Sequence, residues 1–141
     1  MTYVMDTDHL SIADQDTIEG FNLGRRLAAV SAEQVKVTII TYEEQMRGWL
    51  SYIARANTPE QQAQAYRKLQ MFVERYREIP LLSYDARAIA EFEQLKRAKV
   101  RVGTMDMKIA AIAFANNATV LTRNSSDFGR IPGLKIEDWS V

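Results

Sequence analysis

Short apolar runs alternate along this chain with longer stretches in which apolar residues recur every three or four positions. The clearest run, VKVTII at Val35–Ile40, is rich in β-branched residues and predicts a β-strand. Shorter runs predict further strands at residues 3–5, 81–85, 119–122 and 134–139. The longer stretches predict helices at residues 18–30, 41–56, 58–79, 86–99 and 103–115.

Start and stop signals support the predicted helices. Thr58 followed by Pro59 is typical of a helix start, because Thr caps the first turn and Pro suits its first position. Pro80 ends that helix, and the stretch from Tyr42 to Glu78 is predicted to form a two-helix arm. Strands that read as continuous apolar runs and alternate with helices indicate a mostly parallel central sheet with helices on both faces. We therefore expect a three-layer, Rossmann-like α/β fold.

The composition fits a single globular domain over residues 1–141. No long uncharged apolar run is present, so no membrane association is expected, and the start lacks the features of a signal peptide. The absence of Cys excludes a disulfide framework and a thiolate metal site, and it fits a cytoplasmic protein. The 18 basic and 18 acidic residues give zero net charge, which argues against binding polyanions through overall charge but leaves room for a local basic patch.

Acidic residues follow several predicted strands, and functional sites of parallel sheets lie at the carboxyl ends of the strands. Asp6 and Asp8 come directly after the first strand, and two acids so close raise each other's cost of ionisation unless a cation lies nearby. Glu44 follows the second strand, although its spacing from Thr41 also fits a capping box, which is a structural role. Glu43 points about 100° away on the helix, so the two Glu side chains cannot both face one site.

Two further acids belong to later segments. Asp106 stands at the mouth of the apolar helix GTMDMKIAAIAFA, where a carboxylate also favours helix initiation. Asp127 follows the fourth strand, in a loop where Asn124 and Asp127 are also common turn formers. Each acid has a structural explanation alone, but four acids from distant segments at one edge favour a shared site. Such carboxylates suit a hard cation, Mg²⁺ or Mn²⁺, and metal-assisted phosphodiester cleavage.

Four blocks of the sequence, in order, resemble the PIN-domain nucleases and, among them, the VapC toxins of bacterial toxin–antitoxin pairs. The blocks are VMDTDHL, TIITYEEQMRG, GTMDMKIAAIAFA and TRNSSDFGRIPGLKIEDW. They extend over nearly the whole chain, and the last two are the most specific. The resemblance implies a PIN-like fold and a Mg²⁺- or Mn²⁺-dependent endoribonuclease that acts as the toxin of a type II pair. It also implies a VapB-type antitoxin as partner, a homodimer and a toxin–antitoxin hetero-oligomer.

The resemblance also assigns roles to individual residues. It implies that four acids bind the metal and catalyse the reaction: Asp6, Glu44, Asp106 and Asp127. Glu44 is selected because it stands four residues before Gly48. Thr122 and Asn124 correspond to polar residues that support the last acid. Asp8 departs from the family, in which Asn or Ser is common at this position. We expect Asp8 to support the metal ligands without binding the metal itself, in preference to binding it through water or capping the following turn.

Basic residues near the acids are candidates for contacts with RNA phosphates, although charge runs are usually solvated surface. The candidates are Lys96, Arg97, Lys99, Arg101 and Arg123, with Arg25, Arg26 and Arg130 as similar cases. His9, the only His, is expected to be a packed or exposed bystander rather than a ligand.

Two alternative functions remain open at this point. Asp6-Thr7-Asp8 imitates the two-Asp motif of the haloacid-dehalogenase-type phosphatases, but Leu10 departs from that motif and its later paired acids are missing. The other alternative is a catalytically degenerate PIN domain that only binds a partner, against which the four intact acids argue. The sequence does not identify the RNA target.

Overall fold

The computed structural model describes residues 1–141, which is the whole printed chain. Five strands form one sheet in the order β3-β2-β1-β4-β5, and every neighbouring pair is parallel. The strands are β1 (Thr2–Met5), β2 (Val35–Thr38), β3 (Leu81–Leu82), β4 (Ala118–Leu121) and β5 (Ile136–Glu137). The predicted α/β class is confirmed, and the sheet is parallel throughout rather than mostly so.

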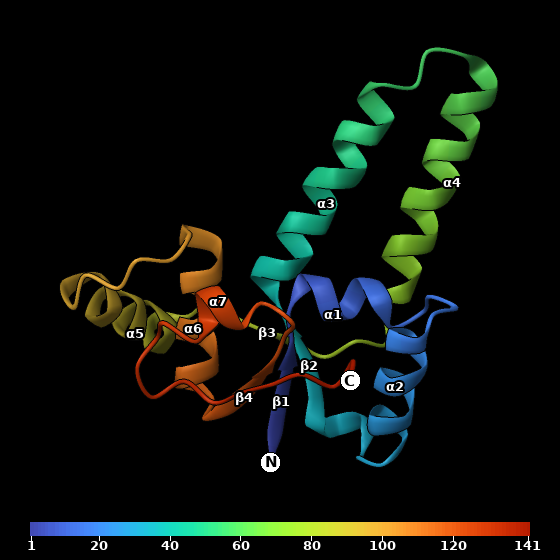
Figure 1. The fold of residues 1–141 in the computed structure, drawn as a ribbon. Helices are drawn as coiled ribbons and strands as arrows, with labels where there is room; N and C mark the ends of the chain where they lie inside the picture. The colour runs from blue at the N-terminus through green and yellow to red at the C-terminus, as the bar shows by residue number, and fades with distance from the viewer.

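Helices cover both faces of this sheet, as Figure 1 shows. The helices are α1 (Thr7–Ile12), α2 (Ile18–Ala28), α3 (Ile39–Ala54), α4 (Pro59–Arg75), α5 (Ala86–Arg97), α6 (Thr104–Ala115) and α7 (Ser125–Phe128). A 3₁₀ turn (Ala32–Gln34) leads into β2. None of the helices has the length and apolar composition needed to span a membrane.

Two apolar cores lie on opposite sides of the sheet. Val4 and Val120 belong to the core beneath α5 and α6, whereas the next residues, Met5 and Leu121, belong to the core beneath α1 and α2. The sides alternate because successive side chains of a strand point to opposite faces. Helix α6 is buried almost all round from Met107 to Ala115, which explains why its sequence is apolar without a polar face.

The order of the strands places the reversal in the direction of winding beside β1. The chain passes from β1 to β2 and β3 on one side, and then returns to β4 and β5 on the other. In open parallel sheets, ligands bind at the carboxyl ends of the strands where the direction of winding changes. Here that position lies between the ends of β1 and β4, which are joined where the Asp6 N–H donates to the Leu121 carbonyl oxygen at 3.1 Å.

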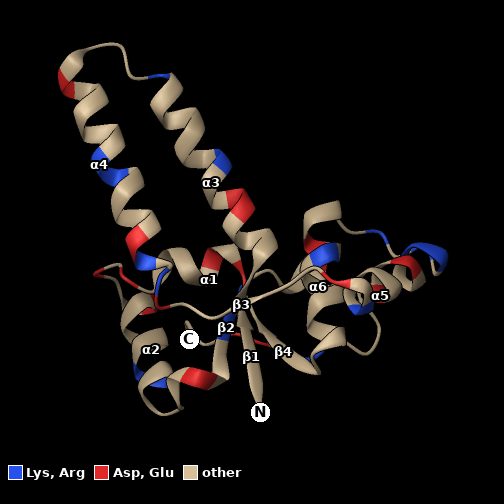
Figure 2. Cartoon of the chain, turned by 180° about the vertical axis from the view of Figure 1, so that it is seen from behind, with Lys and Arg blue, Asp and Glu red and all other residues tan.

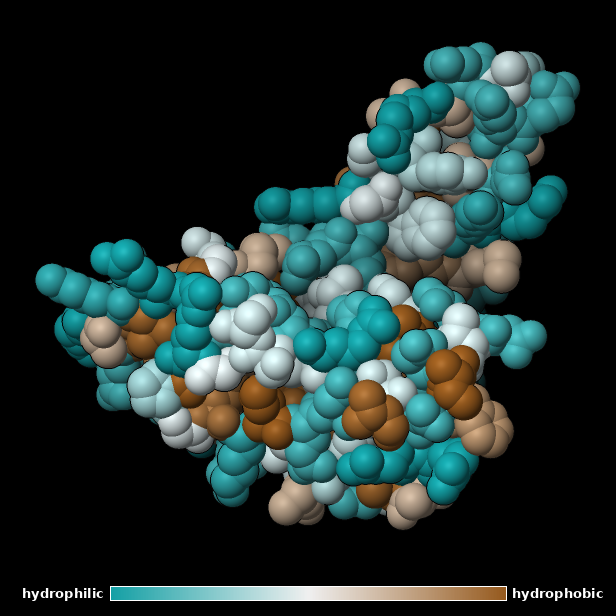
Figure 3. Space-filling view, viewed as in Figure 1, coloured by the Kyte–Doolittle hydropathy of each residue, from teal (hydrophilic) through white to brown (hydrophobic).

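The predicted two-helix arm is confirmed and consists of α3 and α4, which project beyond the sheet (Figure 1). Thr58 caps α4 as expected, because its side chain accepts from the Gln61 N–H while the Gln61 side chain accepts from the Thr58 N–H. At the base of the arm, the rings of Tyr42, Phe72 and Tyr76 pack with centroids 4.7–5.3 Å apart. The arm's surface is mostly hydrophilic in Figure 3, while the apolar residues visible on that face gather on the body below.

Several predicted boundaries are wrong, and one error concerns the site. Strand β2 ends at Thr38, whose side chain accepts from the Thr41 N–H, so α3 begins at Ile39 rather than Thr41. The capping box predicted as a structural role for Thr41 and Glu44 therefore does not form. The pattern also predicts no helix at residues 7–12, where α1 lies, and only a loop around Asp127, which α7 contains.

Candidate metal centre

Asp6 lies buried at the carboxyl end of β1 and caps the first turn of α1. Its Oδ1 accepts from the His9 N–H at 2.8 Å, and its Oδ2 accepts from the Thr122 hydroxyl at 2.5 Å. Because Thr122 follows β4, the second hydrogen bond joins the carboxyl ends of two neighbouring strands. Burial raises the pKa of Asp6 from 3.8 to about 6, and the charges of Asp8 and Asp106 add to the increase.

Glu44 reaches the same region from α3. Its Oε1 accepts from the Thr7 hydroxyl at 3.2 Å, which ties α3 to the start of α1. Glu43 faces the opposite way, because its carboxylate binds the Arg47 guanidinium at 2.6 Å on the outside of the helix. Burial raises the pKa of Glu44, and the charge of Asp106 contributes to the rise. The expectation that only one of these two Glu residues can face the site agrees with this geometry.

Asp106 is the third residue of α6 but does not act as its cap. Gly103 occupies the N-cap position, and no side chain caps this helix. Burial raises the pKa of Asp106, the charge of Asp127 adds to it, and no hydrogen bond to the carboxylate offsets the rise. Helix initiation therefore accounts for where Asp106 stands, but it leaves the carboxylate without a partner.

Asp127 is held in place by Asn124. The Asn124 side-chain amide donates to Asp127 Oδ2 at 2.9 Å, while Asn124 Oδ1 accepts from the Asp127 N–H at 3.3 Å. Thr122 in turn accepts from the Asn124 N–H at 2.8 Å while it donates to Asp6. Thr122 and Asn124 thus form a chain of hydrogen bonds that links the first acid to the last.

The four predicted acids lie close enough to affect one another's pKa values. Asp106 raises the pKa of both Asp6 and Glu44, and Asp127 raises the pKa of Asp106. These side chains come from segments up to 121 positions apart in the chain, the separation of Asp6 and Asp127. Oxygen donors that are partly desolvated and repel one another are the donors that a hard divalent cation prefers, and a bound cation would remove the repulsion. The residues therefore fit Mg²⁺ or Mn²⁺.

Asp8 is bound by Arg123 in a two-pronged ion pair. Arg123 Nε donates to Asp8 Oδ2 at 2.7 Å and Arg123 Nη2 donates to Oδ1 at 2.6 Å. These hydrogen bonds lower the pKa of Asp8, whereas the pKa values of Asp6 and Asp106 are raised. Both oxygens of Asp8 are thus engaged by a cationic side chain. Arg123, a predicted RNA contact, therefore forms an ion pair with Asp8.

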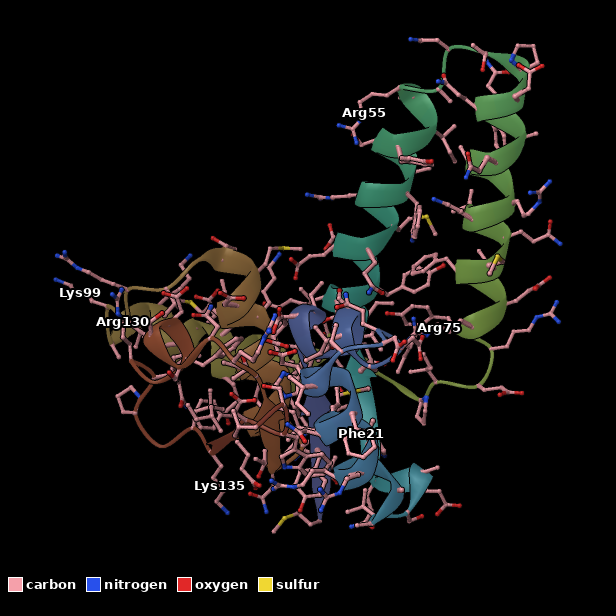
Figure 4. The ribbon with its side chains drawn as sticks, turned by 45° about the vertical axis from the view of Figure 1, so that its right-hand side comes forward. Phe21, Arg55, Arg75, Lys99, Arg130 and Lys135 are labelled. Carbon is pink, nitrogen blue, oxygen red and sulfur yellow. The ribbon has the colours of Figure 1, made fainter.

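Four of the other predicted basic residues, Lys96, Arg97, Lys99 and Arg101, lie in the last turn of α5 and in its connection to α6, whereas Arg25 and Arg26 lie in the last turn of α2. Figure 2 shows basic positions along the end of α5 and in its connection to α6. Arg130, which follows α7, donates to the Arg101 carbonyl oxygen at 3.3 Å, and Figure 4 shows Arg130 and Lys99 extending from the same side of the body. The acid-paired arginines are elsewhere, at Arg26, Arg47, Arg75 and Arg123.

His9, predicted to be a packed or exposed bystander rather than a ligand, is packed beside the site. Its side chain is completely buried, and ligand atoms of Asp6, Asp8 and His9 lie within 4.8 Å of one another. Burial lowers the pKa of His9. The Asp-x-x-His spacing, which places both residues in one helical turn, is the signal that could have identified it, but that signal requires knowing that α1 is a helix.

Comparison with known proteins gives partial sequence matches. The chain is 37% identical over 65 residues to the tRNA(fMet)-specific endonuclease VapC of Salmonella typhimurium, covering 43% of this chain and 49% of that protein. It is 32% identical over 76 residues to ribonuclease VapC2 of Rickettsia felis, covering 51% and 54%. The chain thus spans about half the length of the curated relatives it matches.

Solved structures match over the full length. VapBC2 from Rickettsia felis, bound to a DNA fragment from its promoter, has a TM-score of 0.70 at 23% identity and covers 99% of both chains. VapBC-1 from nontypeable Haemophilus influenzae has a TM-score of 0.73 at 20% identity and covers 100% of both. At these identities the likeness establishes the fold.

The family itself is established by the sequence. The model of the PIN domain matches residues 22–134, which include Glu44, Asp106 and Asp127, while Asp6 lies just before the matched range. The match extends over most of the chain and agrees with the parallel sheet, with the acids at its carboxyl edge and with the solved folds. The chain belongs to the PIN-domain family.

Proposed function

We propose that this protein is a Mg²⁺- or Mn²⁺-dependent endoribonuclease, formed by a single PIN domain over residues 1–141, and that it acts as the toxin of a type II toxin–antitoxin pair. The observation that carries the proposal is the mutual electrostatic coupling of four carboxylates near the carboxyl ends of β1 and β4. The pKa values of Asp6, Glu44 and Asp106 all lie above the ordinary range for their side chains. Raised pKa values in several acids that share the carboxyl edge of a parallel sheet favour a functional site at that edge.

Four acids would hold the cation: Asp6, Glu44, Asp106 and Asp127. Such a cation, when bound, orients a water molecule and stabilises the charge that develops on the phosphate. Asp106 is the best placed to bind directly, because its carboxylate has no other partner. Thr122 and Asn124 fix the orientation of Asp6 and Asp127 through their hydrogen bonds. Asp8 supports the site without binding the cation directly, since Arg123 donates hydrogen bonds to both its oxygens.

We further propose that RNA approaches over the basic surface beside α6. This surface consists of Lys96, Arg97, Lys99, Arg101 and Arg130. Arg101 precedes Asp106 by five residues, and Arg130 follows Asp127 by three, so cations flank both of these acids in the chain. Phosphate contacts of this kind position a strand without reading its sequence. Replacing Lys99 and Arg101 together by Glu should raise the KM for RNA and make it less dependent on salt, with little change in kcat.

The proposed partners follow from the relatives. The matched Salmonella protein is named a tRNA(fMet)-specific endonuclease, and the similar folds are described as VapBC assemblies. We therefore propose RNA as substrate, a VapB-type antitoxin as inhibitor, a homodimer as the toxin's own assembly, and the cytoplasm as location.

A phosphatase of the haloacid-dehalogenase type is not favoured. That reading needs Asp6 as a free nucleophile, but both its oxygens accept hydrogen bonds, from His9 and Thr122. Asp8, the second acid of the imitated motif, is bound by Arg123. A catalytically degenerate domain is expected to have lost some of the four acids, and all four are present.

The proposal is tested by incubating the purified protein with tRNA(fMet), with mixed cellular RNA and with a small phosphoester. Cleavage of RNA in Mn²⁺ or Mg²⁺, abolished by a chelator and absent for the small phosphoester, is expected. Turnover of the small phosphoester with no RNA cleavage would instead support the phosphatase. Inactivity toward all substrates, together with no binding of divalent cations in calorimetry, would support a binding module.

A further inference from the structure

His9 has two ring nitrogens that face two different parts of the molecule. Nε2 lies 3.1 Å from the backbone nitrogen of Trp139, which donates its N–H to the ring. Nδ1 lies on the other side, 3.9 Å from Asp6 Oδ1 and 4.0 Å from Asp8 Oδ2. The imidazole therefore stands between the C-terminal segment and the first two acids of the site.

The contact with Trp139 fixes the position of the ring proton. A backbone N–H can only donate, so Nε2 accepts and carries no proton. An uncharged imidazole has one ring proton, which must then lie on Nδ1. The Asp138 carboxylate, 3.6 Å from Nε2, does not change this assignment, because it accepts instead from the N–H and hydroxyl of Ser140.

This proton position excludes His9 as a cation ligand. A nitrogen that carries a proton has no lone pair to offer, so the grouping of Asp6, Asp8 and His9 is not a metal triad despite its short distances. Instead, Nδ1–H is a buried donor without a hydrogen-bond partner, and carboxylate oxygens of Asp6 and Asp8 lie 3.9 and 4.0 Å from the nitrogen. Buried donors are nearly always paired, so an unpaired one beside a functional site calls for an explanation.

We infer that His9 is a positioning residue, whose Nδ1–H dipole attracts the carboxylates of Asp6 and Asp8 across 3.9 and 4.0 Å, without a hydrogen bond in this structure, and thereby sets the affinity of the site for its cation. The inference rests on the proposed cation site. The ring is oriented from behind by Trp139, whose own ring packs on Tyr3 and beneath Arg26. The C-terminal segment is thus coupled through one histidine to the first metal acid. Groups that orient metal-binding side chains in this way typically change metal affinity by about 10- to 100-fold when removed.

Two substitutions separate the two nitrogens. In His9→Gln the side-chain oxygen replaces Nε2 as acceptor for Trp139, but the donor toward the acids is lost. In His9→Asn the amide nitrogen replaces Nδ1–H, but the acceptor for Trp139 is lost. We expect His9→Gln to bind Mn²⁺ about 10- to 100-fold more weakly than the native protein in calorimetry while unfolding at a similar midpoint. We expect His9→Asn to unfold more easily yet to keep nearly native Mn²⁺ affinity.

Equal Mn²⁺ affinity in His9→Gln and the native protein would overturn the inference, as would equal losses in both variants. Failure of the native protein to bind Mn²⁺ would overturn the proposed function itself, so the two failures are distinguishable. Because the chain has a single His, long-range ¹H–¹⁵N correlation spectra of the native protein assign its tautomer without ambiguity. A proton on Nδ1 that shifts when Mg²⁺ is added is the expected result, and a proton on Nε2 would contradict the inference without any variant being made.

Discussion

Replacing Asp6 by Asn should stabilise the metal-free protein, although it should destroy the site. Folding raises the pKa of Asp6 from 3.8 to about 6, so the folded state favours the protonated carboxyl. Because folding raises the pKa from 3.8 to about 6, ionised Asp6 lowers the unfolding free energy by about 3 kcal/mol once the group is ionised in both states. The sign follows from proton binding: between about pH 4 and pH 6 the folded state binds more protons, and stability falls as the pH rises.

Asn suits the position because it resembles the uncharged carboxyl. Its oxygen can accept from the His9 N–H and cap α1 as Asp6 does, and the Thr122 hydroxyl can rotate to accept from its amide. We therefore expect Asp6→Asn to raise the unfolding free energy by about 1–3 kcal/mol at pH 7.5 in a chelator, less where the new hydrogen bonds are imperfect.

The assay is urea unfolding of both proteins between pH 4 and pH 7.5, with and without Mg²⁺. The stabilisation should shrink toward pH 4, and Mg²⁺ should stabilise the native protein but not the variant. Asp16→Asn, in the exposed turn between α1 and α2, is the matched control and should change stability by less than about 0.5 kcal/mol. An Asp6→Asn protein that is less stable than native at pH 7.5 in chelator, or whose difference does not vary with pH, would refute the reasoning.

Three further outcomes test other parts of the structure. Ile112→Ala empties a fully buried position of α6 and should cost about 2–5 kcal/mol in urea unfolding; a smaller loss would mean that α6 repacks. Asp8→Asn breaks an ion pair whose side chains are about two-fifths exposed, so it should lower stability by less than about 1 kcal/mol. The same variant should leave the number of bound Mn²⁺ ions unchanged in calorimetry, and loss of a bound ion would instead make Asp8 a direct ligand.

The sequence predicts the sheet well because its signal is local and strong. The apolar run of β4 is buried throughout, and the β-branched run of β2 is buried at Val37 and Thr38 and half-buried before them. Strands buried on both faces read as apolar runs. The arm is equally predictable, since Thr58 and Pro59 determine where α4 begins through contacts within one turn.

The errors arise where local preference and tertiary context conflict. Ile39 and Ile40 continue the β-branched pattern of β2, yet they form the first turn of α3, because Thr38 caps a helix there. The pairing of Glu44 with Thr7 then depends on where α1 lies, and α1 has too few residues for a periodic signal. The four acids stay a prediction from their order and from the resemblance. Thr122 and Asn124 are predicted to support the last acid, and Asn124 does contact Asp127, but the contact of Thr122 with Asp6 depends on the pairing of β1 with β4.

His9 illustrates the same limit most clearly. Its partners are Trp139, which is 130 positions away in the chain, and two acids of its own helical region. No periodicity connects such residues, and a lone His is more often a packed or exposed bystander than a functional residue. Only the fold shows that its two nitrogens face different sides.

The central claim is that Asp106 acts with Asp6, Glu44 and Asp127 as one cation-dependent catalytic site. The most direct test compares RNA cleavage by native protein and by Asp106→Asn under single-turnover conditions in saturating Mn²⁺. Asn preserves the start of α6, where the Asp106 side chain makes no cap, but removes the charge. Our account predicts a native-like unfolding midpoint and cleavage slower by roughly 100-fold or more. A folded Asp106→Asn protein that cleaves RNA at the native rate would contradict it.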